Sequence, residues 1–183
     1  MSRTEVRLSG TGGQGIVLAG HILGQAVSLY ENEKFATLTQ SYGPEARGGS
    51  CAAEVVISDE PVGYPYVISP QVLVILSQEA YNKYTPNLGQ ETLVIIDPDL
   101  VKPNASQNLR ILSIPATNLA REMGRVVVAN IIMLGFLAAV SDVVSPEALK
   151  KSILSNVPEG MREFNTKAFE LGYEYGLKNR KRD

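Results

Sequence analysis

The sequence contains little of the chemistry that redox and metal centres require. Cys51 is the one cysteine among 183 residues, so no disulfide can form within the chain. An iron–sulfur cluster needs several ligands, and this chain cannot hold one alone. A lone thiol also fits a reducing compartment, and we therefore expect a cytoplasmic protein.

An excess of charge of one sign and a long apolar run are missing as well. The formal net charge is −2, from 17 Lys and Arg against 19 Asp and Glu, so we do not expect a nucleic-acid partner. The longest apolar run, residues 126–141, is too short to cross a bilayer and predicts a core helix, so no membrane segment is expected. Asn130 interrupts that run and needs a hydrogen-bond partner if it is buried. The length and the hydrophobic fraction of 44% predict a single domain over residues 1–183.

A glycine-rich stretch near the N-terminus organises the rest of the chain. Its residues are Gly10, Thr11, Gly12, Gly13, Gln14 and Gly15, between a strand-like run at 6–9 and an apolar helical run at 16–30. A turn from strand to helix directs unpaired backbone N–H groups at one point, where the helix dipole adds positive charge. Glycines remove the Cβ atoms that would keep a phosphate from those donors. The stretch therefore predicts an anion or cofactor site, and a tight turn without a ligand is the alternative.

Two specific nucleotide sites are disfavoured by the residues around this stretch. The Gly-x-Gly-x-x-Gly spacing matches the dinucleotide fingerprint, but the second strand ends in Gln40 where an acidic residue would bind the ribose. Ile16 and Val17 stand where a phosphate loop of a nucleotide hydrolase needs Lys and Ser or Thr. NAD binding and nucleotide hydrolysis are therefore not expected.

A second unusual stretch, residues 40–50, follows the strand at 34–39. It carries Tyr42, Gly43, Glu45, Arg47 and Gly48. Open α/β sheets bind ligands at the carboxyl ends of their strands, which is where this loop is expected to lie. Arg47 suits a phosphate, a carboxylate or a partner chain, and a surface ion pair between Glu45 and Arg47 is the alternative.

The remaining pattern predicts alternating strands and helices. Strands are expected at 50–58, 72–76, 92–96 and 110–114, and helices at 78–84, 119–124, 126–140, 145–155 and 159–178. The segment 119–124 forms either a helix of its own or the first half of a longer one. Asp97, at the end of a strand, is expected to cap the turn before Pro98. The pattern indicates a doubly wound, Rossmann-like α/β fold with helices on both faces of a mostly parallel sheet. It leaves room for an antiparallel strand at 50–57.

The two glycine-containing stretches together resemble the gamma subunit of 2-oxoacid:ferredoxin oxidoreductases, in particular the 2-oxoglutarate (KorC-like) branch. The segment Asn130-Ile131-Ile132-Met133-Leu134-Gly135 fits as well, and the similarity covers nearly the whole chain. The resemblance implies one subunit of a heterotetrameric enzyme. That enzyme oxidatively decarboxylates a 2-oxoacid, forms an acyl-CoA and reduces ferredoxin.

The resemblance also implies where the cofactors lie. Thiamine diphosphate with its Mg²⁺ and the iron–sulfur clusters are expected on alpha, beta and ferredoxin-like delta partners, with no catalytic residue on this chain. The hypothesis for this subunit is that residues 11–15 bind the phosphates of CoA, while Tyr42 and Arg47 line the approach or dock against the thiamine-binding chain. Two alternatives remain, a purely structural subunit and a free-standing Rossmann-like nucleotide binder. Separated from its partners, the chain is expected to self-associate.

Overall fold

The computed structural model describes residues 3–43 and 48–180. Each predicted strand and helix has a counterpart there, although several begin or end at other residues. In chain order the elements are β1 (Arg3–Thr11), α1 (Ile16–Tyr30), β2 (Phe35–Tyr42), β3 (Ser50–Ser58), β4 (Val72–Ile75), α2 (Gln78–Tyr84), β5 (Leu93–Ile96), β6 (Arg110–Ser113), α3 (Ala116–Glu122), η1 (Val126–Val128), α4 (Ala129–Val140), α5 (Pro146–Asn156), η2 (Glu159–Met161) and α6 (Arg162–Arg180).

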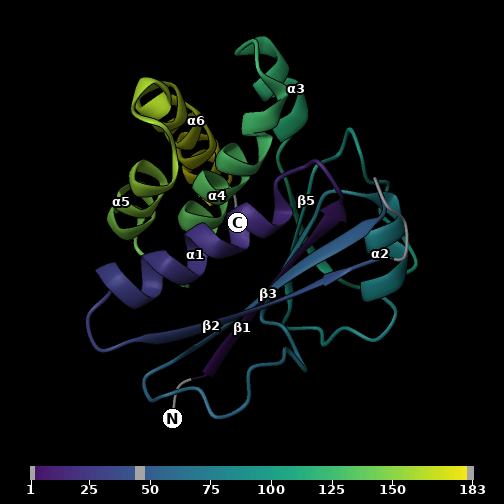
Figure 1. Ribbon diagram of the computed structural model, residues 1–183. Coiled ribbons are helices and arrows are strands. Elements are labelled where there is room, and N and C mark those ends of the chain that lie inside the picture. Colours follow the sequence, from purple (N-terminus) through teal and green to yellow (C-terminus); the bar gives the residue numbers. More distant parts are fainter. Residues whose placement is uncertain (1–2, 44–47, 181–183) are drawn as a thin grey trace.

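The strands form one six-stranded sheet in the order β2-β3-β1-β4-β5-β6 (Figure 1). β1, β4, β5 and β6 pair in parallel, whereas β3 is antiparallel to both of its neighbours. The expected α/β fold is confirmed, and β3 is the strand for which the sequence left an antiparallel direction open. Because β1 lies at the centre, the turn that follows it opens at the middle of the carboxyl edge.

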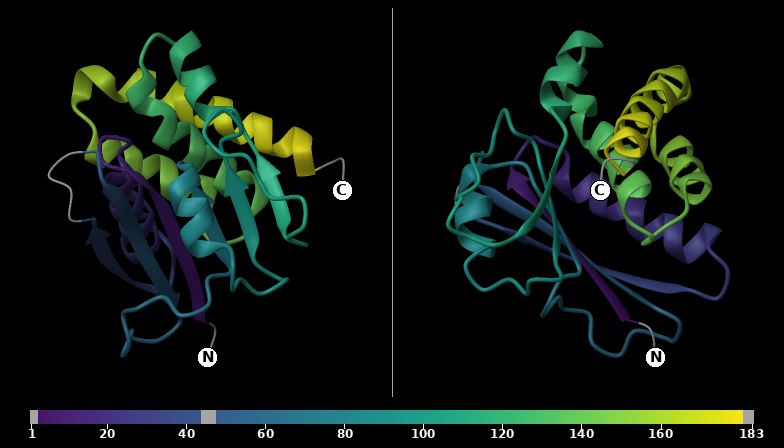
Figure 2. Two further views of the ribbon diagram at one scale, coloured as in Figure 1. Left: turned by 90° about the vertical axis from the view of Figure 1, so that its right-hand side faces the viewer. Right: turned by 180° about the vertical axis from the view of Figure 1, so that it is seen from behind.

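Helices cover both faces of the sheet, as predicted (Figure 2). On one face, the main core joins Val6 and Leu8 of β1 to residues of α1, α4, α5 and α6. On the other face, Ala80 and Tyr81 of α2 pack on alternate residues of β4 and β5. β4 and β5 are buried on both faces and therefore read as continuous apolar runs.

α4 and α6 pack with their backbones in close contact. A Cβ on Gly172 of α6 would lie 2.8 Å from the carbonyl carbon of Ile132 and overlap its oxygen. A Cβ on Gly135 of α4 would lie 2.9 Å from the backbone nitrogen of Tyr173. Glycine is therefore required at both crossing points. α4 is buried almost along its full length, and the structure describes no helix that is long and apolar enough to cross a membrane.

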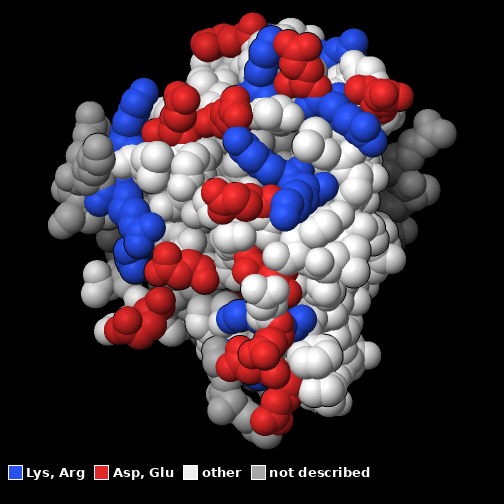
Figure 3. All heavy atoms as spheres, turned by 90° about the vertical axis from the view of Figure 1, so that its left-hand side faces the viewer, with Lys and Arg blue, Asp and Glu red and all other residues white. Residues whose placement is uncertain are grey.

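The outer surface of the helical layer carries charges of both signs. Ion pairs join Lys150 to Glu170 at 2.8 Å and Lys167 to Glu163 at 2.7 Å. Figure 3, which views the molecule from the α5 side of Figure 1, shows basic and acidic groups interspersed. Mixed charge of this kind is typical of a helical face that meets water.

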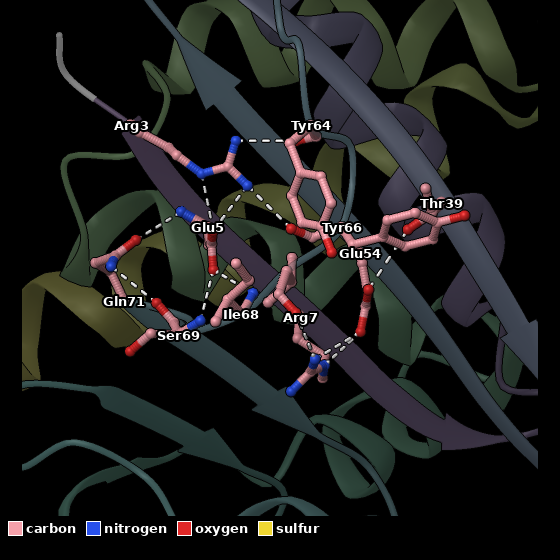
Figure 4. A network of polar contacts seen from close by, with 11 residues as sticks. Arg3, Glu5, Arg7, Thr39, Glu54, Tyr64, Tyr66, Ile68, Ser69 and Gln71 are labelled. Carbon is pink, nitrogen blue, oxygen red and sulfur yellow. Dashed lines mark hydrogen bonds and ion pairs between the residues drawn. The ribbon is translucent and has the colours of Figure 1, made fainter.

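The connection between β3 and β4 (the 59–71 connection) is held against β1 by a polar network (Figure 4). The Glu5 carboxylate accepts hydrogen bonds from the backbone N–H groups of Ile68 and Ser69, both at 2.7 Å, and from Arg3 Nε at 2.8 Å. Arg3 also donates to the carbonyls of Tyr64 and Tyr66. Glu5 is only 5% exposed, so this buried carboxylate anchors the connection.

Cys51 lies in β3 with 6% of its surface exposed. Burial raises the pKa of the Cys51 thiol. As the pH rises, the thiol of the unfolded chain therefore ionises before that of the native chain, and the free energy of unfolding falls above the ordinary thiol pKa.

We expect 5,5′-dithiobis(2-nitrobenzoic acid) to modify the native Cys51 thiol about 100-fold more slowly than the thiol of the chain unfolded in urea. Equal rates in the two states, measured at 412 nm, would contradict this burial.

Candidate functional site

The glycine-rich stretch forms the turn between β1 and α1, as the sequence predicts. Gly10 and Thr11 end β1, and Gly15 precedes α1 in a left-handed conformation with φ of 72°. Gly13 has φ of 96°, which also favours glycine. Among the described residues no side chain caps the N-terminus of α1, so none of them covers its first N–H groups as a cap.

The four glycines do not all serve an incoming anion. A Cβ on Gly10 would overlap the side-chain oxygen of Gln14, and a Cβ on Gly15 would overlap the side-chain nitrogen of Asn130. A Cβ on Gly12 would lie 3.4 Å from the backbone nitrogen of Gly48, whereas one on Gly13 would meet nothing within 4 Å. Contacts within the chain therefore already require glycine at Gly10 and Gly15, and open space for a ligand lies at Gly13.

Several N–H groups of the turn are already bonded within the chain. Thr11 N–H donates to Gln14 Oε1 at 2.7 Å, and Gln14 Nε2 donates to the Leu76 carbonyl at 2.8 Å. Gly12 N–H donates to the Gly49 carbonyl at 2.8 Å, and Gln14 N–H donates to the Thr11 carbonyl at 3.2 Å. Thr11, Gly12 and Gln14 therefore build the turn, and their N–H groups are not available to a ligand.

Other N–H groups at the front of α1 make no hydrogen bond within the described part of the chain. Together with the N–H group of Leu18, which makes the set five, those of Gly13, Gly15, Ile16 and Val17 have no acceptor within residues 3–43 and 48–180. They lie in or next to the first turn of the helix, where the dipole contributes about half a positive charge. This part of the turn can accept an anion, as the sequence predicts for the stretch as a whole.

Asn130 of α4 stabilises the same turn from the other side. The residue is 3% exposed, and its Nδ2 donates to the Gly15 carbonyl at 3.2 Å. The sequence required a partner for a buried Asn130 but did not identify Gly15 as that partner. The sequence does not predict the bond from the Gln14 side chain to Leu76, the residue that follows β4.

A cavity of about 430 Å³ opens beside Gly13, one of the residues with a free N–H group. Gly13 and Gln14 form one side of it, and the other lining residues come from segments beyond the carboxyl ends of β4, β5 and β6: Leu76, Leu100, Thr117, Val126, Val127 and Ala129. Val126 and Val127 are 49% and 64% exposed, which is unusual for valines. The cavity thus combines hydrogen-bond donors with apolar walls, a combination typical of small-molecule sites.

The second stretch lies against the first at one point. Gly49 accepts the hydrogen bond from Gly12 N–H, and Gly43 N–H donates to the Ser50 carbonyl at 2.7 Å. Tyr42 is 65% exposed, and Gly48 has φ of 69°. Glu45 and Arg47 lie outside the described residues, so their predicted roles stay predictions.

Asp97 has the structural role that the sequence predicts. It is fully buried, and its two carboxylate oxygens accept hydrogen bonds from the backbone N–H groups of Asp99 at 3.0 Å and Thr117 at 2.7 Å. Within the described residues, His, Cys, Asp and Glu side chains form no group of three or more that could hold a metal ion.

Comparisons with known proteins agree along the length of the chain. The model of the pyruvate ferredoxin/flavodoxin oxidoreductase family matches residues 5–175. The 2-oxoglutarate synthase subunit KorC of Methanocaldococcus jannaschii is 50% identical over 175 residues, which cover 94% of this chain and 93% of that protein.

Solved structures share the same fold. The gamma subunit of a keto/oxoacid ferredoxin oxidoreductase from Geobacter sulfurreducens PCA is 42% identical with a TM-score of 0.88, over 97% of this chain and 98% of that one. The 2-oxoglutarate:ferredoxin oxidoreductase from Magnetococcus marinus, with 2-oxoglutarate, coenzyme A and succinyl-CoA bound, is 22% identical with a TM-score of 0.85, over 96% of this chain and 31% of that one. This chain belongs to the pyruvate ferredoxin/flavodoxin oxidoreductase family, as its two glycine-containing stretches predicted.

Proposed function

We propose that this chain is the gamma subunit of a 2-oxoglutarate synthase and that its glycine-rich turn binds the phosphates of CoA. The family and the full-length similarity to KorC support the subunit assignment. The observation that carries the CoA assignment is the set of free N–H groups at the front of α1, of which that of Gly13 belongs to a residue lining the cavity. A multiply charged phosphate ester with a long, less polar arm matches that combination.

The rest of the reaction belongs to partner subunits in this proposal. One cysteine cannot ligate an iron–sulfur cluster. Among the described residues, no three His, Cys, Asp or Glu side chains lie close enough together to hold a metal ion. The residues present therefore do not fit the electron-transfer centres or the Mg²⁺ of thiamine diphosphate. We assign these groups to the alpha, beta and delta subunits. This chain supplies a CoA contact and part of the assembly interface, to which Tyr42 and the second stretch contribute.

Replacing Gly13 tests the CoA contact in the assembled enzyme. In Gly13→Asp the new carboxylate stands beside the free N–H groups and repels a phosphate, whereas Gly13→Asn has the same shape and backbone strain without the charge. We expect the KM for CoA to be about tenfold higher in the Asp variant than in the Asn variant, equivalent to about 1.4 kcal/mol. The KM for 2-oxoglutarate is expected to be equal in the two.

The comparison separates the CoA site from a purely structural role. If both variants assemble with the partner chains and have the same KM for CoA, the turn does not meet the phosphates and the structural alternative is favoured. Steady-state kinetics with varied CoA, together with the subunit composition on a native gel, provides both readouts.

A further inference from the structure

Within the described part of the chain, no strand pairs with the outer side of β2 at one edge of the sheet. β2 is the terminal strand in the sheet order and pairs with β3 over its full length, from Phe35 opposite Ser58 to Tyr42 opposite Cys51. The register has no bulge, and the hydrogen bond from Gly43 N–H to the Ser50 carbonyl continues it. Residues that bond to the neighbouring strand alternate along an antiparallel strand, and the Gly43 bond shows which ones they are. The N–H and C=O groups of Phe35, Thr37, Thr39 and Ser41 therefore point toward β3.

The N–H and C=O groups of the intervening residues therefore point away from the sheet. These residues are Ala36, Leu38, Gln40 and Tyr42. β2 contains neither a charged residue nor a proline, the devices that usually prevent an edge from pairing. The opposite edge, β6, is four residues long and begins with Arg110. The two edges thus differ in length and charge, and β2 is the one suited to pairing.

We propose that β2 pairs antiparallel with β2 of a second copy of this chain, about a two-fold axis that passes Thr39. In this register Ala36 lies opposite Tyr42 of the other copy, and Leu38 lies opposite Gln40. Each outward N–H and C=O group from Ala36 to Tyr42 then has a partner. The two six-stranded sheets join into one.

The absence of charged residues in β2 favours a second copy of this chain as the partner of that strand. Across a two-fold axis each strand faces itself, so any charged residue near the axis would meet its own charge. β2 has no such residue, and its exposed ends carry aromatic side chains instead, with Phe35 45% and Tyr42 65% exposed. Moving the axis to Leu38 would place Tyr42 opposite position 34, beyond the end of the strand, and so satisfies fewer groups.

A cysteine at the axis tests both the pairing and its register. Thr39 faces its own copy in a non-hydrogen-bonded pair, where Cα atoms are about 4.5 Å apart and within reach of a disulfide. Mild oxidation of full-length Thr39→Cys should give a covalent dimer on a non-reducing gel. Thr37→Cys is the matched control, because in this register its two copies are about 13 Å apart. Buried Cys51 does not compete.

Proline in the edge gives an independent readout. Gln40 directs its N–H away from β3, so Gln40→Pro removes no bond within the sheet but blocks pairing with a second copy. We expect wild type and Gln40→Thr to have a dimeric mass by light scattering at about 100 μM, and Gln40→Pro to have a monomeric mass with an unchanged circular dichroism spectrum. A monomeric wild type, or equal cross-linking of the two cysteine variants, would overturn the proposal.

Discussion

Gly172→Ala is expected to lower the free energy of unfolding by about 3 kcal/mol, equivalent to a fall in Tm of about 6 to 12 °C. The new methyl group, whose position is fixed by the α6 backbone, would overlap the backbone carbonyl of Ile132 in α4. No rotamer change can relieve that contact, so α6 must move away from α4. Calorimetry or urea unfolding of the full-length chain measures the effect.

Gly160→Ala is the control for this substitution. Gly160 lies in the short η2 helix, and a Cβ there would meet nothing within 4 Å. We expect a change below about 0.5 kcal/mol, as for other surface positions. If Gly172→Ala and Gly160→Ala unfold at the same urea concentration, α4 and α6 are not in backbone contact.

Glu5→Ala is expected to destabilise the chain by about 3 kcal/mol. It removes the acceptor for two backbone N–H groups, those of Ile68 and Ser69, and leaves Arg3 without its carboxylate partner. Because these bonds attach the 59–71 connection to β1, the loss is expected to be local first. Hydrogen exchange at Ile68 and Ser69 should accelerate more than exchange in β5.

Glu60→Ala provides the comparison on the same connection. Glu60 is exposed, and its backbone N–H rather than its carboxylate makes the bond to Ser58. The free energy of unfolding of Glu60→Ala, and hydrogen exchange at Ile68 in that variant, should match those of the wild type. A Glu5→Ala chain that is as stable as Glu60→Ala would show that the carboxylate network contributes no net stability.

The order of the elements could be predicted because each carries a local signal. Val72–Ile75 and Leu93–Ile96 read as buried strands, and Ser145 before Pro146 marks the start of α5. The break between α3 and α4 was harder to place. Gly124, with φ of 90°, ends that helical segment, and η1 follows before α4 begins. A glycine in an apolar helical pattern is compatible with continuing or ending the helix, so the sequence left both open.

The candidate site was predictable in position but not in detail. Strand, glycine turn and helix locate the N–H donors, but pairing with distant residues decides which of them remain free. Gly12 is bonded to Gly49, and Gln14 to Leu76, and both bonds depend on tertiary structure. Val126 and Val127 of η1 form part of the apolar cavity wall. Their position there depends on tertiary structure, and the sequence carries no signal for it.

The bonds that Gln14 and Asn130 make to the turn have a consequence for affinity. Both side chains hold the backbone in place before any anion arrives, since one reaches Leu76 and the other Gly15. A ligand at this point displaces solvent but does not have to order a flexible loop, so little entropy is lost on association. We therefore expect this preorganised turn to bind an anion more tightly than a mobile glycine segment with the same backbone donors.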